Sequence, residues 1–253
     1  MFTVVTGFFD IGRGEWQYYN RKLDTYLQHF ANMLSLKVNM IIFIEPKFVN
    51  FVESNRNHIN CKTIIIPMDI TNLYMYQYLE RITEIQNKPG YFTGHLNVTA
   101  PEICQPLYNV VTCSKMHLLA EATKIDTNSD YFIWLDAGYT HGTMDLSILH
   151  WNPTCLFEHR DKFSVIALQS LEAAAEDPRE FFLQYIDVLI GGFMGGYRDI
   201  INKIKDLYYD LVLEMLELDL KDDDQFYNTI LAKRHPELFN VIQSTWYGAM
   251  TFL

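Results

Sequence analysis

Apolar, β-branched segments alternate with segments of helical periodicity along the first half of the chain, and this alternation limits the folds open to it. We expect strands at 2–8 (FTVVTGF), 38–44 (VNMIIFI), 62–66 (KTIII) and 131–135 (YFIWL), and helices at 17–35, 71–86 and 112–125. Helices that connect successive strands place those strands parallel in one sheet and cover both of its faces. Strands that are apolar throughout fit burial on both sides. The sequence therefore predicts an α/β protein with a mostly parallel sheet flanked by helices.

The second half of the chain is less regular. We expect strands at 163–168, 186–190 and 238–243, and amphipathic helices at 198–217 and 224–234. The segment 87–110 carries three prolines and two glycines, which favours a long surface loop. Because no linker, low-complexity tract or internal repeat interrupts the sequence, we expect a single domain over residues 1–253.

The charge and the cysteines narrow the class of protein. The 31 acidic and 20 basic residues give a net charge of −11, which disfavours a nucleic-acid partner bound through phosphate neutralisation. The four cysteines occur singly, without CxxC spacing, so neither a disulfide framework nor a zinc site is indicated. No stretch reaches the roughly 18 apolar residues of a membrane span, and the start MFTVVTGFFDIG lacks the basic region of a signal peptide. We expect a cytoplasmic protein with a small-molecule partner and no integral membrane segment.

Two motifs follow expected strands directly. GFFDIGRGEW (7–16) has three glycines that let a ligand approach the backbone, and Arg13 suits a phosphate, although a plain strand-to-helix turn explains the motif equally well. Its spacing is neither GxGxxG nor a P-loop, which argues against a dinucleotide site of the Rossmann type. In WLDAGY (134–139), Asp136 follows a buried strand. A carboxylate there can hold a divalent cation that bridges a diphosphate, or it can simply end the strand as a turn residue.

Two further motifs lie in the second half. IGGFMGGY (190–197) contains two glycine pairs, which predict either unusual backbone dihedrals, such as those of a β-bulge, or the close passage of another group such as a ligand. In KDDDQFYNTIL (221–231), one acid is explained as the cap of the helix that follows. The other acids are surplus to that role, and a carboxylate at a helix start beside a pocket is a candidate general base.

Taken in order, these four motifs resemble those of the GT-A class of nucleotide-sugar glycosyltransferases. More closely, TVVTGFFDIGRGEW, YNVVTCSK (108–115) and YFIWLDAGY are similar to the HtrL/YibB family of bacterial proteins, which is linked to surface-polysaccharide synthesis. The resemblance covers roughly the whole chain. It implies one GT-A-like, Rossmann-related domain with a nucleotide-binding half (1–140) and an acceptor-side half (141–253). It also implies transfer of a sugar from a nucleotide sugar, in the first place a UDP-sugar, to a glycan or another hydroxyl acceptor.

The same resemblance implies roles for particular residues. Asp136 matches the first acid of the Asp-x-Asp motif that holds Mn²⁺ or Mg²⁺ in GT-A enzymes, whereas Gly138 stands in place of the second acid. One acid alone is a weak site for such a cation, so His141 or Asp145 would have to supply a further ligand. The remaining implied roles are a nucleotide site at Thr6 and Gly7, phosphate contacts from Arg13 or Lys115, a sugar and acceptor wall at Gly191, Gly192, Phe193, Gly195 and Gln225, and a catalytic carboxylate at Asp223 or Asp224.

Two alternatives from other classes remain open at this point. A non-catalytic protein that binds nucleotides or carbohydrates is compatible with the Asp-x-Gly sequence at Asp136. A phosphatase of the haloacid-dehalogenase type also places an Asp at a strand end, and DAGYT loosely resembles its DxDGT motif. The missing second acid and the mid-chain position of the motif argue against the phosphatase.

Overall fold

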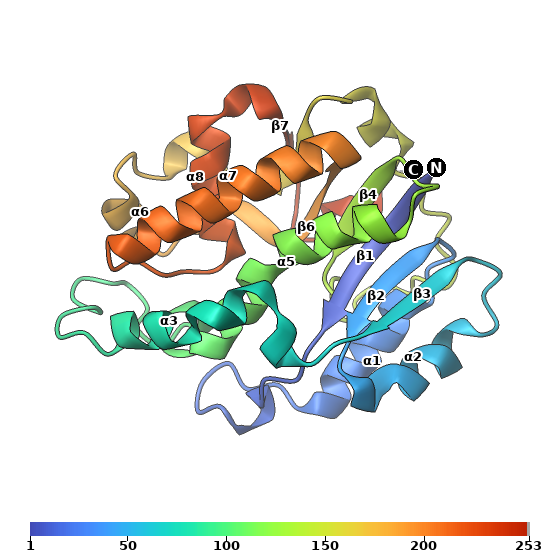
Figure 1. Cartoon of the computed structure of the whole chain (residues 1–253), viewed down its shortest axis with the longest axis horizontal. Coiled ribbons are helices and arrows are strands. Elements are labelled where there is room, and N and C mark those ends of the chain that lie inside the picture. The colour runs from blue at the N-terminus through green and yellow to red at the C-terminus, as the bar shows by residue number, and fades with distance from the viewer. Residues whose placement is uncertain (252–253) are drawn as a thin grey trace.

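The computed structural model describes residues 1–251 and has a seven-stranded sheet at its centre. The strand order is β3-β2-β1-β4-β6-β5-β7 (Figure 1). The strands are β1 (Phe2–Phe8), β2 (Met40–Ile44), β3 (Thr63–Pro67), β4 (Tyr131–Leu135), β5 (Phe163–Ala167), β6 (Leu189–Tyr197) and β7 (Phe239–Gln243). β6 runs antiparallel to both of its neighbours, β4 and β5, while every other strand pair is parallel. The mostly parallel α/β sheet expected from the sequence is thereby confirmed.

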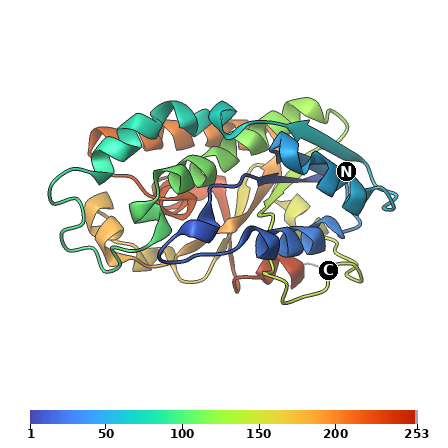
Figure 2. The same cartoon turned by 90° about the horizontal axis from the view of Figure 1, so that it is seen from below.

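Helices cover both faces of this sheet, as the two perpendicular views show (Figures 1 and 2). On one face the main helices are α3 (Leu79–Gln86), α5 (Pro106–Ile125), α7 (Arg198–Glu217) and α8 (Asp224–Arg234). On the other face lie α1 (Leu23–Leu34) and α2 (Val49–Arg56). Two short helices, α4 (Pro101–Cys104) and α6 (Pro178–Gln184), complete the set of α-helices. None of the helices within residues 1–251 combines the length and the hydrophobicity that crossing a bilayer requires.

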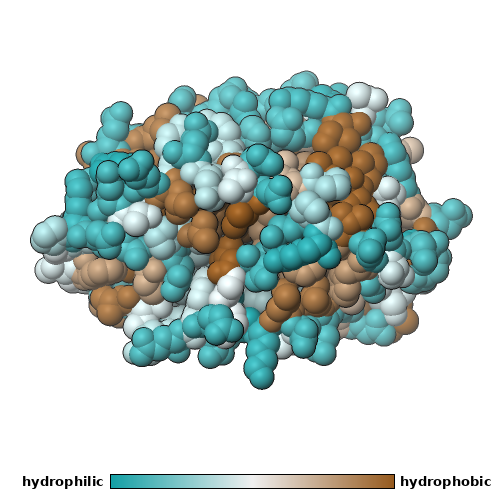
Figure 3. All heavy atoms as spheres, turned by 60° about the horizontal axis from the view of Figure 1, so that its bottom comes forward, coloured by the Kyte–Doolittle hydropathy of each residue, from teal (hydrophilic) through white to brown (hydrophobic). Residues whose placement is uncertain are grey.

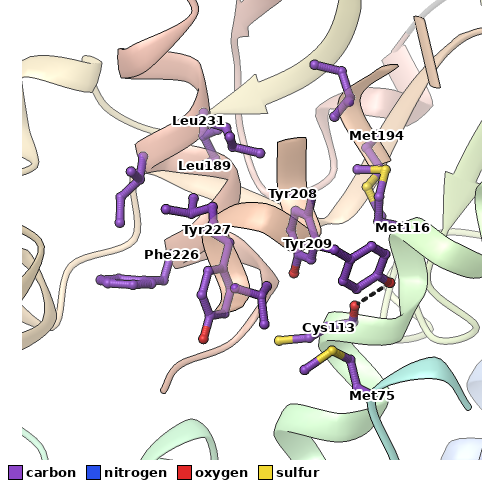
Figure 4. Packing of buried hydrophobic residues seen from close by; sticks show 14 of the residues in the cluster. Met75, Cys113, Met116, Leu189, Met194, Tyr208, Tyr209, Phe226, Tyr227 and Leu231 are labelled. Atoms are coloured by element: carbon purple, nitrogen blue, oxygen red, sulfur yellow. Dashed lines mark hydrogen bonds between the residues drawn. The ribbon is translucent and has the colours of Figure 1, made fainter. Parts of the chain in front are cut away.

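The larger of the two cores lies where α5, α7 and α8 meet the sheet. Met116 of α5 and Met194 of β6 are both buried in it, together with Tyr208 and Tyr209 of α7 (Figure 4). The hydroxyl of Tyr209 donates to the backbone carbonyl oxygen of Cys113, 3.1 Å away, so this buried polar group is satisfied. The contact ties α7 to α5, the helix that carries Lys115.

Several helix boundaries differ from those expected. The helix predicted over 17–35 begins only at Leu23, because the segment before it turns through a left-handed Tyr19 with φ of 54°. Of the predicted helix 71–86, residues Tyr74–Tyr78 are 3₁₀ and only Leu79–Gln86 are α-helical. The predicted loop 87–110 is wrong over its last ten residues, since α4 and α5 start at Pro101 and Pro106. Proline is favoured at the first position of a helix, so these prolines begin helices rather than interrupt them.

The sheet brings the expected motifs to one edge. Because β1 and β4 are parallel neighbours, the segments that follow Phe8 and Leu135 leave the sheet on the same side. The antiparallel β6 enters the sheet at this edge, with Phe193 paired to Leu135. The chain after β1, the chain after β4 and the first residues of β6 therefore meet.

Candidate active site

A cavity of about 380 Å³ opens where these three segments meet. Its walls come from the β1–α1 connection, from α5, from the turn after β4, from the start of β6, from the start of α8 and from residues 246–247. Figure 3 looks onto the molecule with the lower side of Figure 1 brought forward, and apolar surface is visible there in a central hollow between hydrophilic side chains. A cavity of this size at the carboxyl ends of parallel strands is the usual place for a ligand in an open α/β fold.

Lys115 is the centre of the polar groups in this cavity. Its Nζ lies 2.9 Å from Asp136 Oδ1, 3.1 Å from Asp136 Oδ2 and 3.0 Å from the carbonyl oxygen of Gly191. It also lies 3.1 Å from Asp224 Oδ2, an ion-pair distance without the alignment of a good hydrogen bond. Burial alone would lower the pKa of Lys115, but the charges of the two aspartates raise it above its ordinary value. The ammonium is thus a fixed positive charge between two carboxylates.

Asp136 is held in place from three directions. Its backbone N–H donates to the carbonyl oxygen of Gly192 at 3.0 Å, which fixes the turn after β4 against β6. Trp134 Nε1 donates to Asp136 Oδ1 at 2.7 Å, and Lys115 donates from the side of α5. The residue is therefore more than a turn-forming acid, because its carboxylate has fixed partners and lines the cavity.

Asp223 and Asp224 lie at the start of helix α8 and differ in their contacts. Asp223 is the N-cap, since its carboxylate accepts from the backbone N–H of Gln225 at 3.0 Å. Asp224, the next residue, is almost fully buried and faces Lys115. Burial raises the pKa of Asp224 to about 8, Lys115 opposes this, and the nearby charges of Asp223 and Asp136 add to it. A carboxyl group with a pKa near the working pH is suited to exchange a proton.

The glycines of β6 make this arrangement possible. None of them has a positive φ, so the unusual dihedrals that were one of the expected alternatives are absent, although the register between β6 and β5 shifts where Val165 pairs with Met194 and Ala167 with Leu189. The other alternative, close passage, is confirmed. A Cβ at Gly191 would lie 2.7 Å from both carboxylate oxygens of Asp224, and one at Gly192 would lie 2.9 Å from the ring of Tyr139.

Two arginines, Arg13 and Arg21, line the same cavity. Arg13 donates from Nε to the carbonyl oxygen of Tyr19 at 2.8 Å and from Nη1 to the hydroxyl of Tyr26 at 2.5 Å. The guanidinium of Arg21 lies over the ring of Tyr26, 4.8 Å from its centroid. Neither arginine forms an ion pair within residues 1–251, although the chain is acidic overall. The cavity therefore offers two unneutralised guanidinium groups to an anion.

His141 also lines the cavity, and its backbone φ of 49° lies in the left-handed region. Its Nδ1 lies 3.2 Å from the hydroxyl of Tyr247. Burial, together with the positive charge of Arg21 and the neighbouring His29, lowers the pKa of His141. These surroundings favour the neutral form of the imidazole.

The structure brings together most of the expected site residues. The cavity is lined by Gly7, Arg13, Lys115, Asp136, Gly138, His141, Gly191, Gly192, Asp223, Asp224 and Gln225. Three expected residues lie elsewhere: Thr6 is buried within β1, Phe193 belongs to the apolar core on the α1 side, and Gly195 packs against the backbone of β4. They fail to reach the cavity because side chains alternate between the faces of a strand, and because Gly195 lies farther along β6.

Sequence reasoning missed Arg21, Tyr139 and Tyr247, which also line the cavity. Arg21 lies in the segment between β1 and α1, which was read as part of a helix. Its closeness in sequence to Arg13 was a signal that could have identified it.

The expected metal site was tested against the donor set around Asp136. Within residues 1–251, no three Asp, Glu, His or Cys side chains come together in a way that would hold a metal ion. The second acid of Asp-x-Asp is absent, and His29 fills the space beside Gly138, with its Cβ 3.5 Å from the position of a Cβ at 138. Asp145 is fully exposed, and its carboxylate accepts from Ser147 instead. These residues do not fit a conventional divalent-metal site, and Mn²⁺ or Mg²⁺ stays a prediction from the resemblance.

Comparisons with known proteins place this site in context. The family described as "Bacterial protein of unknown function (HtrL_YibB)" matches the chain over residues 1–253. Protein HtrL of Escherichia coli (strain K12) is 29% identical over 261 residues, which cover 94% of this chain and 86% of that protein.

Among solved structures, the apo form of mouse xyloside xylosyltransferase 1 has a TM-score of 0.50 at 16% identity. The alignment covers 95% of this chain and 84% of the mouse chain. This likeness is one of fold, and it confirms the single GT-A-like α/β domain expected from the sequence.

Proposed function

Because this chain belongs to the HtrL/YibB family of bacterial proteins and has the GT-A fold, we propose that it is a glycosyltransferase. The donor is a nucleotide sugar, in the first place a UDP-sugar, and the acceptor is a hydroxyl group of a glycan. The observation that carries the proposal is the placement of Lys115 between Asp136 and Asp224, in a cavity at the carboxyl ends of β1 and β4 that Arg13 and Arg21 also line. The chain is proposed to act in the cytoplasm, where nucleotide sugars are made.

The charges in the cavity suit a nucleoside diphosphate. A diphosphate oxygen becomes more negative as the bond to the sugar breaks, and preorganised cations stabilise that charge. Arg13 and Arg21 supply guanidinium N–H groups that fit phosphate oxygens. Gly7 also borders the cavity, and packing accounts for its lack of a side chain, since a Cβ there would lie 3.2 Å from both Phe9 and Trp134.

Asp224 is the proposed general base. The acceptor hydroxyl gives its proton to the Asp224 carboxylate as its oxygen bonds to the anomeric carbon, and the bond from that carbon to the diphosphate breaks with its electron pair on the diphosphate oxygen. The pKa of about 8 makes the ionised Asp224 carboxylate a stronger base than an ordinary aspartate, and the ionised fraction grows as the pH approaches 8. The fixed N-cap role of Asp223 makes it the weaker candidate. Gly192 and Gln225 line the same region and would contact the sugar and the acceptor.

A thermal-shift panel of nucleotides and nucleotide sugars tests the donor class first. We expect the melting temperature to rise with one nucleoside diphosphate family, led by UDP, because a ligand that binds only the folded state stabilises it. Release of free nucleoside diphosphate from the matching sugar donor then tests turnover. A protein that binds the donor without ever releasing nucleotide, with any glycan acceptor, is a binding protein and not a transferase.

A further inference from the structure

We infer that the side-chain cations of this chain, with Lys115 at their centre, take the place of the divalent metal in its donor site, so that nucleotide binding needs no metal ion. This inference rests on the proposed function, because it concerns how the proposed nucleoside diphosphate is held. It departs from the Mn²⁺ or Mg²⁺ that the Asp-x-Asp resemblance implies.

The surroundings of Lys115 Nζ are those of a bound hard cation. Oxygen atoms from Asp136, Asp224 and Gly191 lie between 2.9 and 3.1 Å from the nitrogen. Carboxylate and backbone carbonyl oxygens are also the ligands that Mg²⁺ and Mn²⁺ prefer. An ammonium group already occupies the position between the two carboxylates where such an ion would be expected to bind.

Burial holds the ammonium group of Lys115 in its position. Its side chain is 8% exposed and that of Asp224 is 3% exposed, so neither charge can turn into solvent without leaving a buried partner uncompensated. Removing one partner of such a pair is costly, whereas an exposed ion pair exchanges freely with ions in solution. A divalent cation would therefore have to displace a covalently attached charge that is fixed in its site.

A metal in such a site would also contact the phosphates directly, and in this chain the arginines would make those contacts. Arg13 uses two of its N–H groups on Tyr19 and Tyr26 and keeps the rest of its guanidinium for another acceptor. Arg21 makes no side-chain hydrogen bond or ion pair within residues 1–251, and only the ring of Tyr26 supports it. Two guanidinium groups that have no acidic partner within residues 1–251, in a cavity that four aspartates also line, provide a binding site for an anion.

The direct test is calorimetric titration of the full chain with UDP, first in buffer containing EDTA and then in buffer containing Mn²⁺. We expect UDP to bind in EDTA with the same affinity as in Mn²⁺. Binding that appears only with Mn²⁺ overturns the inference and leaves the proposed function standing. If no nucleoside diphosphate binds in either buffer, the proposed function falls and this inference falls with it.

Arg21→Gln provides the second arm, because Arg21 is partly exposed and its replacement leaves the buried charges of Lys115 intact. We expect UDP affinity in EDTA to fall by about 10- to 100-fold, the effect of losing a charge-assisted hydrogen bond. The matched control is Arg160→Gln. The guanidinium of Arg160 lies over the ring of Tyr197, 5.0 Å from its centroid, as that of Arg21 lies over Tyr26, but Arg160 does not line the cavity. The Arg160→Gln variant should therefore bind UDP with the affinity of the parent protein. Equal affinities of both variants and the parent contradict the inference.

Discussion

The carboxylate of Asp224 lies directly against the backbone of Gly191, so closely that a Cβ at position 191 would be 2.7 Å from both carboxylate oxygens. Side chains do not approach a Cβ atom to that distance, so the two positions cannot both carry side chains in this geometry. Lys115 contacts both of them, through the carbonyl oxygen of Gly191 and Oδ2 of Asp224. A change at Gly191 therefore moves the proposed base and the central cation together.

Gly191→Ala tests this relationship. We expect the extra methyl group to destabilise the fold by about 1–3 kcal/mol through overpacking, and to lower transfer by about 100-fold, because small displacements of a reacting group are costly in rate. Denaturant unfolding and initial transfer rates measure the two effects. Gly14→Ala is the control, since the nearest atom to a Cβ at Gly14 is 3.7 Å away. A Gly191→Ala protein with parental rates would show that the contact with Asp224 has no catalytic importance.

The paired substitutions Asp224→Asn and Asp223→Asn separate the base from the cap. Asn caps helices about as well as Asp, so Asp223→Asn should keep both stability and transfer. Asp224→Asn should bind UDP but lose about 10²–10⁴-fold in transfer rate, the usual contribution of a general base. Steady-state rates alongside UDP titration give the answer. The assignment is wrong if Asp223→Asn is the variant that loses transfer.

The pH dependence of stability reports the raised pKa of Asp224. An unfolded Asp has a pKa near 4, whereas burial in the folded state raises the pKa of Asp224 to about 8. Between these two values the folded state holds a proton that the unfolded state has lost, so the contribution of Asp224 to stability falls as pH rises from about 4 to about 8. We expect Asp224→Asn to lose stability less steeply with pH than the parent over this window. Identical slopes of unfolding free energy against pH would contradict a raised pKa at Asp224.

The same titration should appear in the rate. If Asp224 acts as a base it must be ionised, so kcat/KM should increase with pH up to about 8 and then level off. The residual activity of Asp224→Asn should lack this rise. A parental profile that is flat from neutral to alkaline pH would remove Asp224 from the role of base.

Lys115→Ala tests whether a metal ion can bind where the Lys115 ammonium group lies in the parent protein. The substitution leaves two carboxylates without their positive partner, and we expect a loss of about 3–5 kcal/mol in unfolding free energy. Because the oxygen ligands of Asp136, Asp224 and Gly191 stay in place, Mn²⁺ should raise the melting temperature of this variant more than that of the parent. Lys124→Ala, which removes an exposed ion pair with Glu121, is the control and should change stability by less than about 1 kcal/mol. An equal response to Mn²⁺ in all three proteins would mean that the vacated position holds no cation.

The periodicity of the sequence was sufficient to predict the sheet, because strands such as YFIWL are apolar throughout and lie between helices. It could not predict that β6 runs antiparallel, since alternation within a strand is independent of its direction. The prolines at 101 and 106 were misread, because proline both interrupts helices and begins them.

The sequence could predict site residues where a motif follows a strand, as at Asp136. It could not predict which residues contact one another in the site. Lys115 and Asp224 are 109 positions apart, and only the packing of α8 against α5 and β6 brings them together. Glycines at 191 and 192 indicated that something passes close by, but the sequence could not identify it as the Asp224 carboxylate and the Tyr139 ring.

In the function proposed above, a nucleoside diphosphate binds in the cavity that Lys115, Arg13 and Arg21 line. A crystal structure of the chain grown with UDP tests it most directly. We expect electron density for the diphosphate beside Arg13 and Arg21, with Lys115 still between Asp136 and Asp224. UDP bound at another place on the molecule, with this cavity filled by solvent, would contradict it.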